Sequence, residues 1–221
     1  MIRSSYFEKS VSRETLLKLT KYHEFLIENN KKISLISKNT EKIAVKRHYE
    51  DCAQLIKYID KTDQTILDVG TGAGLPGIIL EIIKNDYDMS FSTHLVEKSP
   101  KKGKFLKKAN SFLDLDLKIH NCDVNSMNKK EFTTLISRAF KPMRTFLEII
   151  SNAQLKFKKI IMMKGENFMD EFIDAKKYSP GANCKNLTPT AGAWNILTIS
   201  LTSVKQKIVA IIKINTQKTS R

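Results

Sequence analysis

Residues 66–77 read Ile-Leu-Asp-Val-Gly-Thr-Gly-Ala-Gly-Leu-Pro-Gly, and the chain is built outward from them. An apolar run over residues 65–69 ends at a cluster of glycines, and a segment with helical character over residues 76–84 follows at once. This order predicts a strand, a tight turn and a helix whose N-terminus faces a ligand. Asp68 stands out because it places a carboxylate at the carboxyl end of an apolar strand. Close approach of the backbone to a ligand is expected at Gly70, Gly72, Gly74 and Gly77.

Strands and helices continue to alternate after this unit. Helices are predicted over residues 99–113, with Ser99 as cap and Pro100 at the first position, and over residues 143–155. Further strands are predicted at residues 92–97, 115–120, 133–137 and 159–163. Residues 196–204 and 207–214 are β-rich runs joined by a short polar link, which predicts an antiparallel hairpin. The pattern predicts an α/β fold with a doubly wound, mainly parallel sheet of seven strands that ends in this hairpin.

Two helices are predicted before the first strand. Ser12 can cap a helix that ends near residue 30, and Asn39 or Thr40 can cap a second helix that ends near residue 59. No linker rich in Gly, Ser or Pro separates these helices from the strand that follows. We therefore expect a single domain over residues 1–221, in which residues 1–60 form a helical extension packed on the rest.

The composition indicates a polyanionic partner and a reducing compartment. Lys and Arg number 38 against 23 Asp and Glu, which gives a net charge of +15. Nucleic acid is the expected partner, although A/T-rich codons would also enrich a chain in Lys, Ile and Asn. The polar N-terminus argues against a signal peptide, and no apolar run approaches the roughly 18 residues that a membrane helix needs. Because Cys52, Cys122 and Cys184 are few, odd in number and widely spaced, we expect a cytoplasmic protein without a disulfide framework or a zinc site. We expect neither a metal nor a membrane among its partners.

Residues 72–77 formally satisfy the G-x-G-x-x-G pattern, but several features argue against a nicotinamide cofactor. Asp68 would stand close to a pyrophosphate, the chain is short for a separate substrate domain, and no hydride-transfer constellation is evident. A P-loop is excluded because no Gly-Lys-Ser/Thr follows. S-adenosylmethionine fits better, since it carries no phosphate and its ammonium and sulfonium charges favour a carboxylate such as Asp68. Glu97 can accept from both ribose hydroxyls, and Asp123 or Asn125 can contact adenine beside the neighbouring strand ends.

The residues around the fourth strand bear on the methyl acceptor. No cysteine lies near Ser137, and methylation of a base carbon usually needs one. No Asn/Asp-Pro-Pro-aromatic stretch, typical of exocyclic amine methylation, follows the strand. A ring nitrogen such as guanine N7 needs no general base, so positioning supplies most of the catalysis. Arg138 can contact guanine O6, a phosphate or the cofactor, and Phe140 can stack on a flipped base or belong to the core.

Two groups of basic residues can bind RNA phosphates or form solvated faces. The first group is Lys98, Lys101, Lys102, Lys104, Lys107 and Lys108, and the second is Lys156, Lys158, Lys159 and Lys164. His48 lies on an apolar helical stripe, which favours a core histidine over a catalyst.

These motifs, taken in order, resemble the RsmG family (glucose-inhibited division protein B), bacterial methyltransferases that act on guanine N7 in small-subunit ribosomal RNA. The matches are Ser34-Leu-Ile, Arg47-His-Tyr-Glu-Asp51, the stretch from Asp68 to Gly77, Leu95-Val-Glu97, Lys101-Lys-Gly-Lys-Phe-Leu106, Ser137-Arg-Ala-Phe140, Lys164-Gly165 and residues 207–213. The Leu-Pro-Gly extension of the loop, joined to Ser-Arg-Ala-Phe, is far more specific than the glycine loop alone.

The resemblance implies a Rossmann-like, S-adenosylmethionine-dependent methyltransferase fold and a substrate in 16S ribosomal RNA, either naked or within the small ribosomal subunit. It adds Gly70, Leu75, Arg138 and the residues after the third strand as cofactor contacts. The expected cofactor-binding residues are Asp68, Gly70, Gly72, Gly74, Leu75, Glu97, Asp123, Val124, Asn125 and Arg138. Arg138 is also expected to position substrate or cofactor, and Lys164 to take part in catalysis. The alternatives are a methyltransferase of another RNA or a small molecule, and a basic RNA-binding module without catalysis.

Overall fold

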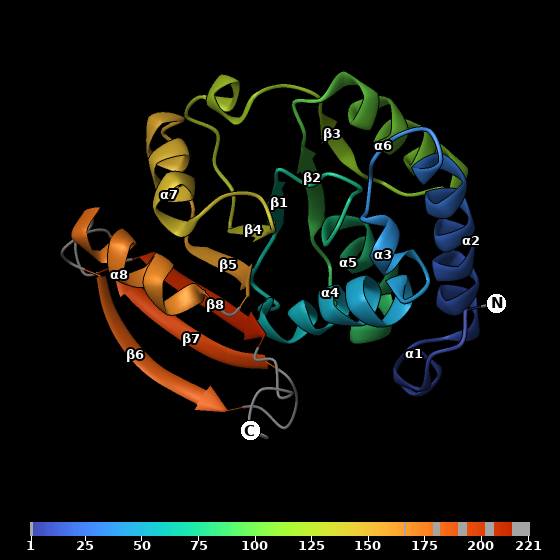
Figure 1. Cartoon of the computed structure of the whole chain (residues 1–221), viewed down its shortest axis with the longest axis horizontal. Coiled ribbons are helices and arrows are strands. Elements are labelled where there is room, and N and C mark those ends of the chain that lie inside the picture. Colours follow the sequence, from blue (N-terminus) through green and yellow to red (C-terminus); the bar gives the residue numbers. More distant parts are fainter. Residues whose placement is uncertain (1, 166, 179–181, 190–193, 202–205, 214–221) are drawn as a thin grey trace. The chain divides into compact units, whose positions relative to one another are not determined.

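A computed structural model describes residues 2–165, 167–178, 182–189, 194–201 and 206–213 (Figure 1). Two compact parts make up the chain, residues 1–123 and residues 124–221. Within the described ranges, every helix is too short or too polar to cross a membrane.

The first part contains three parallel strands in the order β3-β2-β1. These strands are β1 (Thr65–Val69), β2 (Ser92–Val96) and β3 (Lys118–His120). The β1 prediction is confirmed, whereas β3 begins three residues later than predicted. The backbone before β3 bonds to the preceding helix instead of to the sheet, since Leu115 and Leu117 donate to the main chain and side chain of Asn110 at 3.0 and 3.1 Å.

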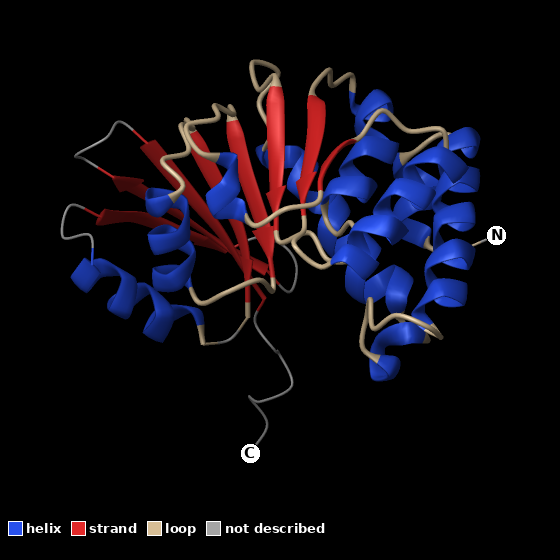
Figure 2. Ribbon diagram, turned by 90° about the horizontal axis from the view of Figure 1, so that it is seen from above, coloured by secondary structure: helices blue, strands red, loops and turns tan. Residues whose placement is uncertain are grey.

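Helices α5 (Gly77–Ile83) and α6 (Pro100–Phe112) connect the three strands. Every residue of α5 is buried, because α5 packs on β2 and also contacts α2 and α4. Figure 2 shows strands in red and helices in blue, and helices lie beside the strands. The predicted start of α6 is confirmed, since Ser99 caps the helix and Pro100 is its first residue. A 3-10 turn, η3 (Lys84–Tyr87), follows α5.

The N-terminal region forms α1 (Ser5–Ser10), which the sequence pattern did not indicate, and α2 (Arg13–Asn30). The predicted cap of α2 is confirmed, because the Ser12 side chain accepts a hydrogen bond from the amide of Thr15. An apolar stripe along this helix is buried, with Leu19, Tyr22 and Leu26 at 0% exposure. This stripe packs α2 against α5.

The predicted helix over residues 40–59 is wrong as a single element. The structure has α3 (Lys38–Glu41), the π-helix η1 (Val45–Glu50), α4 (Asp51–Ala53) and the 3-10 helix η2 (Gln54–Tyr58). Thr40 does not cap a helix, because its hydroxyl bonds to the Ser37 carbonyl and lies 2.9 Å from His48 Nε2. His48 is buried, as expected for a core histidine.

The second part contains strands in the order β4-β5-β8-β7-β6. Strands β4 (Thr134–Arg138), β5 (Lys159–Lys164) and β8 (Gln206–Lys213) are parallel, and β7 (Trp194–Leu201) pairs antiparallel with both β8 and β6 (Ala182–Pro189). The helical elements are η4 (Val124–Met127), α7 (Met143–Asn152) and α8 (Phe168–Tyr178).

The predicted count of seven strands is wrong, because β6 is an eighth strand among the described residues. Helix α8 was also missed, although Phe168, Phe172 and Ala175 recur at helical spacing and are buried. Residues 202–204 and 214, the predicted ends of the two hairpin strands, lie outside the described residues.

Candidate active site

Asp68 lies beneath the glycine loop and is completely buried. Its Oδ2 accepts hydrogen bonds from the Thr71 hydroxyl at 2.6 Å and from the Gly77 amide at 2.8 Å. The second bond caps the start of α5, where Pro76 supplies no side-chain cap. The structure therefore places Asp68 as a support of the loop, and a direct contact between its carboxylate and a cofactor stays a prediction.

The glycines of the loop serve two different needs. Gly70, Gly72 and Gly74 have φ of 70°, 60° and 89°, a region that side chains disfavour. At Gly72 a Cβ would meet nothing within 4 Å, so the loop is open on that side. At Gly77, whose φ is not unusual, a Cβ would instead collide with Leu95 and approach Asp68, so this glycine permits close packing of helix on strand.

Glu97 joins the end of β2 to the glycine loop. Its carboxylate accepts from the Gly72 amide at 3.0 Å and from the Ser99 amide at 2.8 Å. The side chain is half-buried, so its carboxylate combines loop contacts with remaining acceptor capacity. The structure thus brings together two strand ends that the sequence predicts to be neighbours.

Asn121 is a loop-supporting residue that the sequence reasoning missed. Its side-chain amide donates to the carbonyls of Glu97 at 2.7 Å and Ser99 at 3.3 Å. It occupies the space above Gly103, where a Cβ would collide with it. The glycine within α6 was therefore the available signal for a side chain packed closely against that helix.

The amides of the loop are already bonded within the protein. Gly70 and Thr71 donate to the Val96 carbonyl at 3.0 and 3.2 Å, while Gly74 and Leu75 donate to the Thr71 carbonyl at 3.0 and 3.1 Å. A phosphate-binding loop presents such amides to its anion instead. The open side at Gly72 and the Glu97 carboxylate fit a cofactor with ribose hydroxyls and no phosphate, as S-adenosylmethionine is.

The residues expected around adenine fall on either side of the division between the two parts. Asp123, the last residue of the first part, lies 3.6 Å from Lys98 Nζ and its side chain is 45% exposed. In the second part, Val124 is buried and Asn125 is exposed. Their contacts with a cofactor stay predictions.

Arg138 ends β4 and is half-buried. The next residue, Ala139, has φ of 50°, an unusual conformation for a residue with a side chain. Phe140 packs edge-to-face on Phe146 of α7, with ring centroids 6.4 Å apart. This contact favours a structural role for Phe140 in the turn that follows Arg138.

Lys164 is part of a clamp rather than an exposed cation. Its Nζ donates to the Lys141 carbonyl and to Glu171 Oε2, both at 2.7 Å, and its side chain is 10% exposed. The same Glu171 oxygen accepts from the Met143 amide at 2.9 Å and so caps α7. Glu171 was missed because α8, which carries it, was not predicted.

The two lysine groups differ in the structure. Lys101, Lys104, Lys107 and Lys108 are exposed along α6, as expected for a binding or solvated face. In the second group Lys156 and Lys158 are exposed, whereas Lys159 is buried and Lys164 is held in its clamp. Across the described ranges, His, Cys, Asp and Glu form no group suited to a metal ion.

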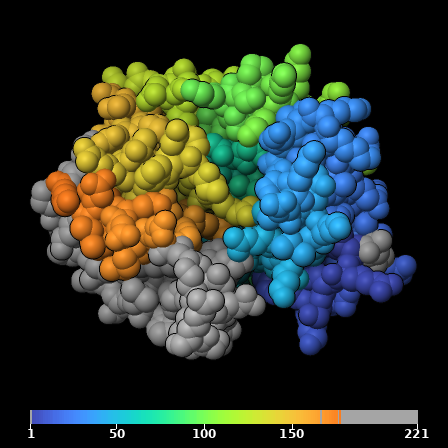
Figure 3. Space-filling model, viewed as in Figure 1, coloured from blue at the N-terminus to red at the C-terminus, as the bar shows by residue number. Residues whose placement is uncertain are grey.

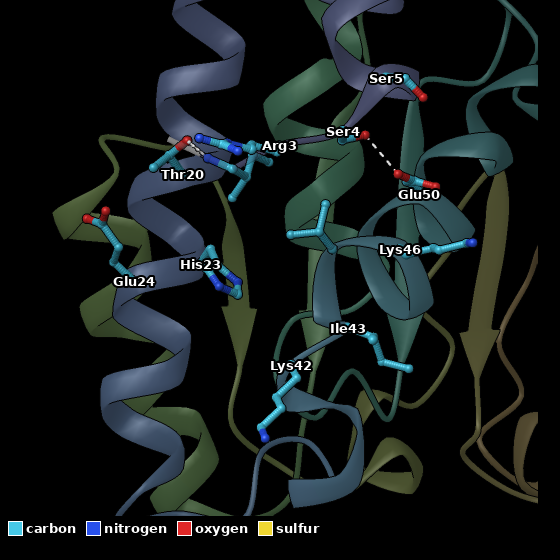
Figure 4. A pocket seen from close by; sticks show the side chains of 12 residues that line it. Arg3, Ser4, Ser5, Thr20, His23, Glu24, Lys42, Ile43, Lys46 and Glu50 are labelled. Atoms are coloured by element: carbon cyan, nitrogen blue, oxygen red, sulfur yellow. Dashed lines mark hydrogen bonds between the residues drawn. The ribbon is translucent and has the colours of Figure 1, made fainter.

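A separate cavity of about 620 Å³ lies within the first part, between the N-terminus, α2 and residues 42–50 (Figure 4). Its charged lining is mixed, since it contains Arg3, Lys42 and Lys46 as well as Glu24 and Glu50. The Ser4 hydroxyl donates to Glu50 at 2.8 Å on one wall. On another wall, burial lowers the pKa of His23, and this effect outweighs the opposite effect of nearby Glu24.

Comparison with known proteins adds independent findings. The family model described as "GidB: rRNA small subunit methyltransferase G" matches residues 15–188. The ribosomal RNA small subunit methyltransferase G of Pelagibacter ubique is 36% identical over 162 residues, which cover 72% of this chain and 76% of that protein. The protein of the same name from Rickettsia rickettsii (strain Sheila Smith) is 33% identical over 167 residues, covering 76% and 84%. A solved ribosomal protein L11 methylase from Lactobacillus delbrueckii shows a TM-score of 0.46 and 16% identity, covering 68% and 76%.

Proposed function

Because the chain belongs to the rRNA small subunit methyltransferase G family, we propose that it transfers a methyl group from S-adenosylmethionine to N7 of a guanine in 16S ribosomal RNA. The observation that carries the proposal is the glycine loop, in which the amides of Gly70, Thr71, Gly72, Gly74 and Leu75 are bonded within the protein while the Gly72 side is open. Such a loop suits a nucleoside cofactor that lacks phosphate. The net charge of +15 supports an RNA substrate.

In this function S-adenosylmethionine supplies a methyl group activated by its sulfonium sulfur. Gly72 leaves room for the cofactor beside the main chain, and Glu97 accepts from ribose hydroxyls with the acceptor capacity that its loop contacts leave. Asp68 holds the turn in shape from below. Asp123, Val124 and Asn125 form the adenine side, and Gly70, Gly74 and Leu75 line the loop.

Guanine N7 carries an available lone pair, so its methylation depends on alignment more than on proton removal. Arg138 is the residue that positions the base or the cofactor, since it is the last residue of β4 and directly precedes the strained turn at Ala139. Lys164 acts through that turn, because its hydrogen bond to the Lys141 carbonyl holds the segment after Arg138. Lys164 is thus a positioning residue rather than a proton donor.

Two further proposals concern the architecture of the domain and the location of the protein. We propose that β7 and β8 form the antiparallel terminal hairpin of a single methyltransferase domain, supported by their register from Trp194↔Lys213 to Leu201↔Gln206. The N-terminal helices then form an extension of that domain, supported by the packing of α2 on α5.

We also propose a cytoplasmic location, where the RNA substrate is found.

Mass spectrometry of 16S ribosomal RNA from a deletion strain tests the function. We expect one guanine to lose its methyl group, and an unchanged methylation pattern would overturn the proposal. Purified protein with labelled S-adenosylmethionine should then modify either naked RNA or small ribosomal subunits in vitro. Methylation of another RNA, or cofactor binding without transfer to any RNA, would instead favour the two alternative functions.

A further inference from the structure

Three phenylalanine rings form a stack between α2 and α6. Phe25 of α2 stacks on Phe105 with centroids 5.4 Å apart and an interplanar angle of 26°. On its other side Phe25 stacks on Phe112, at 5.0 Å and 20°. The two α6 rings are seven residues apart, about 10.5 Å along a helix, so a single ring from α2 fits between them.

The stack runs from the core to the surface. Phe105 is 1% exposed, Phe25 is half-buried, and Phe112 is 56% exposed. Since Phe25 covers one face of Phe112, the exposed area belongs to its other face and its edge. The stack thus presents a rigid aromatic face to solvent, held from behind by two further rings.

The helix that carries this face is strongly basic. Residues 99–113 contain no acidic residue, and the five lysines of α6 are Lys101, Lys102, Lys104, Lys107 and Lys108. None of these lysines forms an ion pair with any residue in the described ranges, and all but Lys102, which is half-buried, are exposed. Lys108 lies one turn before Phe112, and Lys21 lies one turn before Phe25 on α2. In the space-filling view, the N-terminal helices (blue) and α6 (green) form adjoining surfaces (Figure 3).

We propose that Phe112 is a stacking site for an unpaired base of the RNA substrate, and that Lys104 and Lys108 hold the phosphates beside that base. An exposed aromatic face flanked by unpaired lysines matches single-stranded RNA, in which every base offers a π-face and every nucleotide a negative charge. The site rests on the proposed function, since it needs an RNA substrate. It lies at the far end of α6, whose first residue, Pro100, is close to Glu97 in the chain, so it would hold RNA about 18 Å of helix away from that end.

The test is fluorescence anisotropy with a short, labelled single-stranded RNA whose sequence is taken from 16S ribosomal RNA. Phe112→Ala should weaken binding about tenfold or more, while Phe112→Trp should keep wild-type affinity. Phe112→Leu should resemble the alanine variant, because it is apolar without a stacking face. Ile173→Ala, which removes another exposed apolar side chain, is the matched control and should bind normally.

Further measurements separate stacking from other causes. Replacing Lys104 and Lys108 by Gln should lower the salt slope of binding by about two. Unchanged melting temperature and cofactor affinity in Phe112→Ala would show an intact fold. Wild-type RNA affinity in Phe112→Ala, or full affinity in Phe112→Leu, would overturn the stacking site alone. If the wild type binds RNA but never methylates it, the proposed function fails while the site stands, and no RNA binding at all would overturn both.

Discussion

The loop after β1 and the loop after β4 both follow a buried parallel strand, yet they are held in different ways. The first is held from within, by a completely buried Asp68 that bonds to residues three and nine positions away. The second is held from outside, by Lys164 and Glu171, which lie 23 and 28 residues from the main-chain atoms that they bond. The glycine loop is thus supported by a buried carboxylate from the strand that precedes it, β1. The loop after β4 is supported by a partly exposed ion pair between β5 and α8.

These two kinds of support predict that the two loops differ in rigidity. A buried carboxylate without its partners is costly, so the first loop has one stable arrangement. An ion pair with side chains 10% and 29% exposed retains access to water, so its loss costs less. We therefore expect the glycine loop to be preorganised and the turn after Arg138 to adjust more readily.

The largest effect is expected for Asp68→Ala. It removes two buried hydrogen bonds and leaves the Gly77 amide without its acceptor. The free energy of unfolding should fall by about 3 kcal/mol, and cofactor binding should be lost. Urea unfolding and calorimetry measure these, with Asp68→Asn as the milder control because it keeps one acceptor oxygen. Near-wild-type stability in Asp68→Ala would remove the contrast between the two loops.

Lys164→Met should cost about 2 kcal/mol of unfolding free energy, because it breaks a partly buried ion pair. Methyl transfer should fall more than cofactor affinity, since the turn after Arg138 loses its support. A double-mutant cycle with Glu171→Gln should show coupling between the two residues. Additive effects of the two changes would show that the clamp does not act as a unit.

Gly72→Ala in the glycine loop should change cofactor affinity more than it changes folding stability. At φ of 60° a side chain costs about 1–2 kcal/mol, but its Cβ meets no protein atom within 4 Å. Cofactor affinity measured by calorimetry should therefore fall far more than stability does. Gly77→Ala is the matched control, because its Cβ would collide with Leu95 and should mainly destabilise the fold. Tight cofactor binding by Gly72→Ala would contradict the proposal that the cofactor lies against the open side of the loop at Gly72.

Tyr22→Phe probes the anchor between α2 and the glycine loop. The Tyr22 hydroxyl is buried and donates to the Ala73 carbonyl at 2.8 Å. Its removal should cost about 1 kcal/mol of unfolding free energy and lower cofactor affinity by a few-fold. Because this hydroxyl bonds to the main chain of the loop itself, hydrogen exchange should rise first at residues 70–75. Unchanged exchange there would mean that the anchor does not restrain the loop.

The smallest effect concerns pH. Burial lowers the pKa of His23, so the folded protein binds fewer protons than the unfolded chain at mildly acidic pH. The contribution of the neutral His23 imidazole to the free energy of unfolding is thus fully present above the usual histidine pKa of about 6.5. It declines as the pH falls below that value. Urea unfolding of wild type and His23→Gln at several pH values measures this decline. A wild-type curve that is no steeper than that of the variant would contradict the burial effect.

Local sequence was sufficient for the elements whose signals lie within a few residues. Strand β1, the Ser12 cap of α2 and the Ser99-Pro100 start of α6 were all predicted correctly, since caps and apolar periodicity act over one or two turns. The same signals failed at residues 40–59, where the Thr40 hydroxyl bonds to His48 instead of capping a helix. A side-chain contact eight residues away is invisible to a capping rule.

The sequence by itself determined the alternation of strands and helices from β1 to β5, the glycine loop and the family to which the chain belongs, because all three rest on linear motifs. Tertiary structure alone decided what the residues in those motifs touch. It placed Asp68 under the loop, Glu97 on the Gly72 amide, Lys164 in a clamp with Glu171, and three phenylalanines in one stack. Hydrogen bonds and ring contacts depend on distances in space, and residues 25, 105 and 112 become neighbours only when two helices pack together.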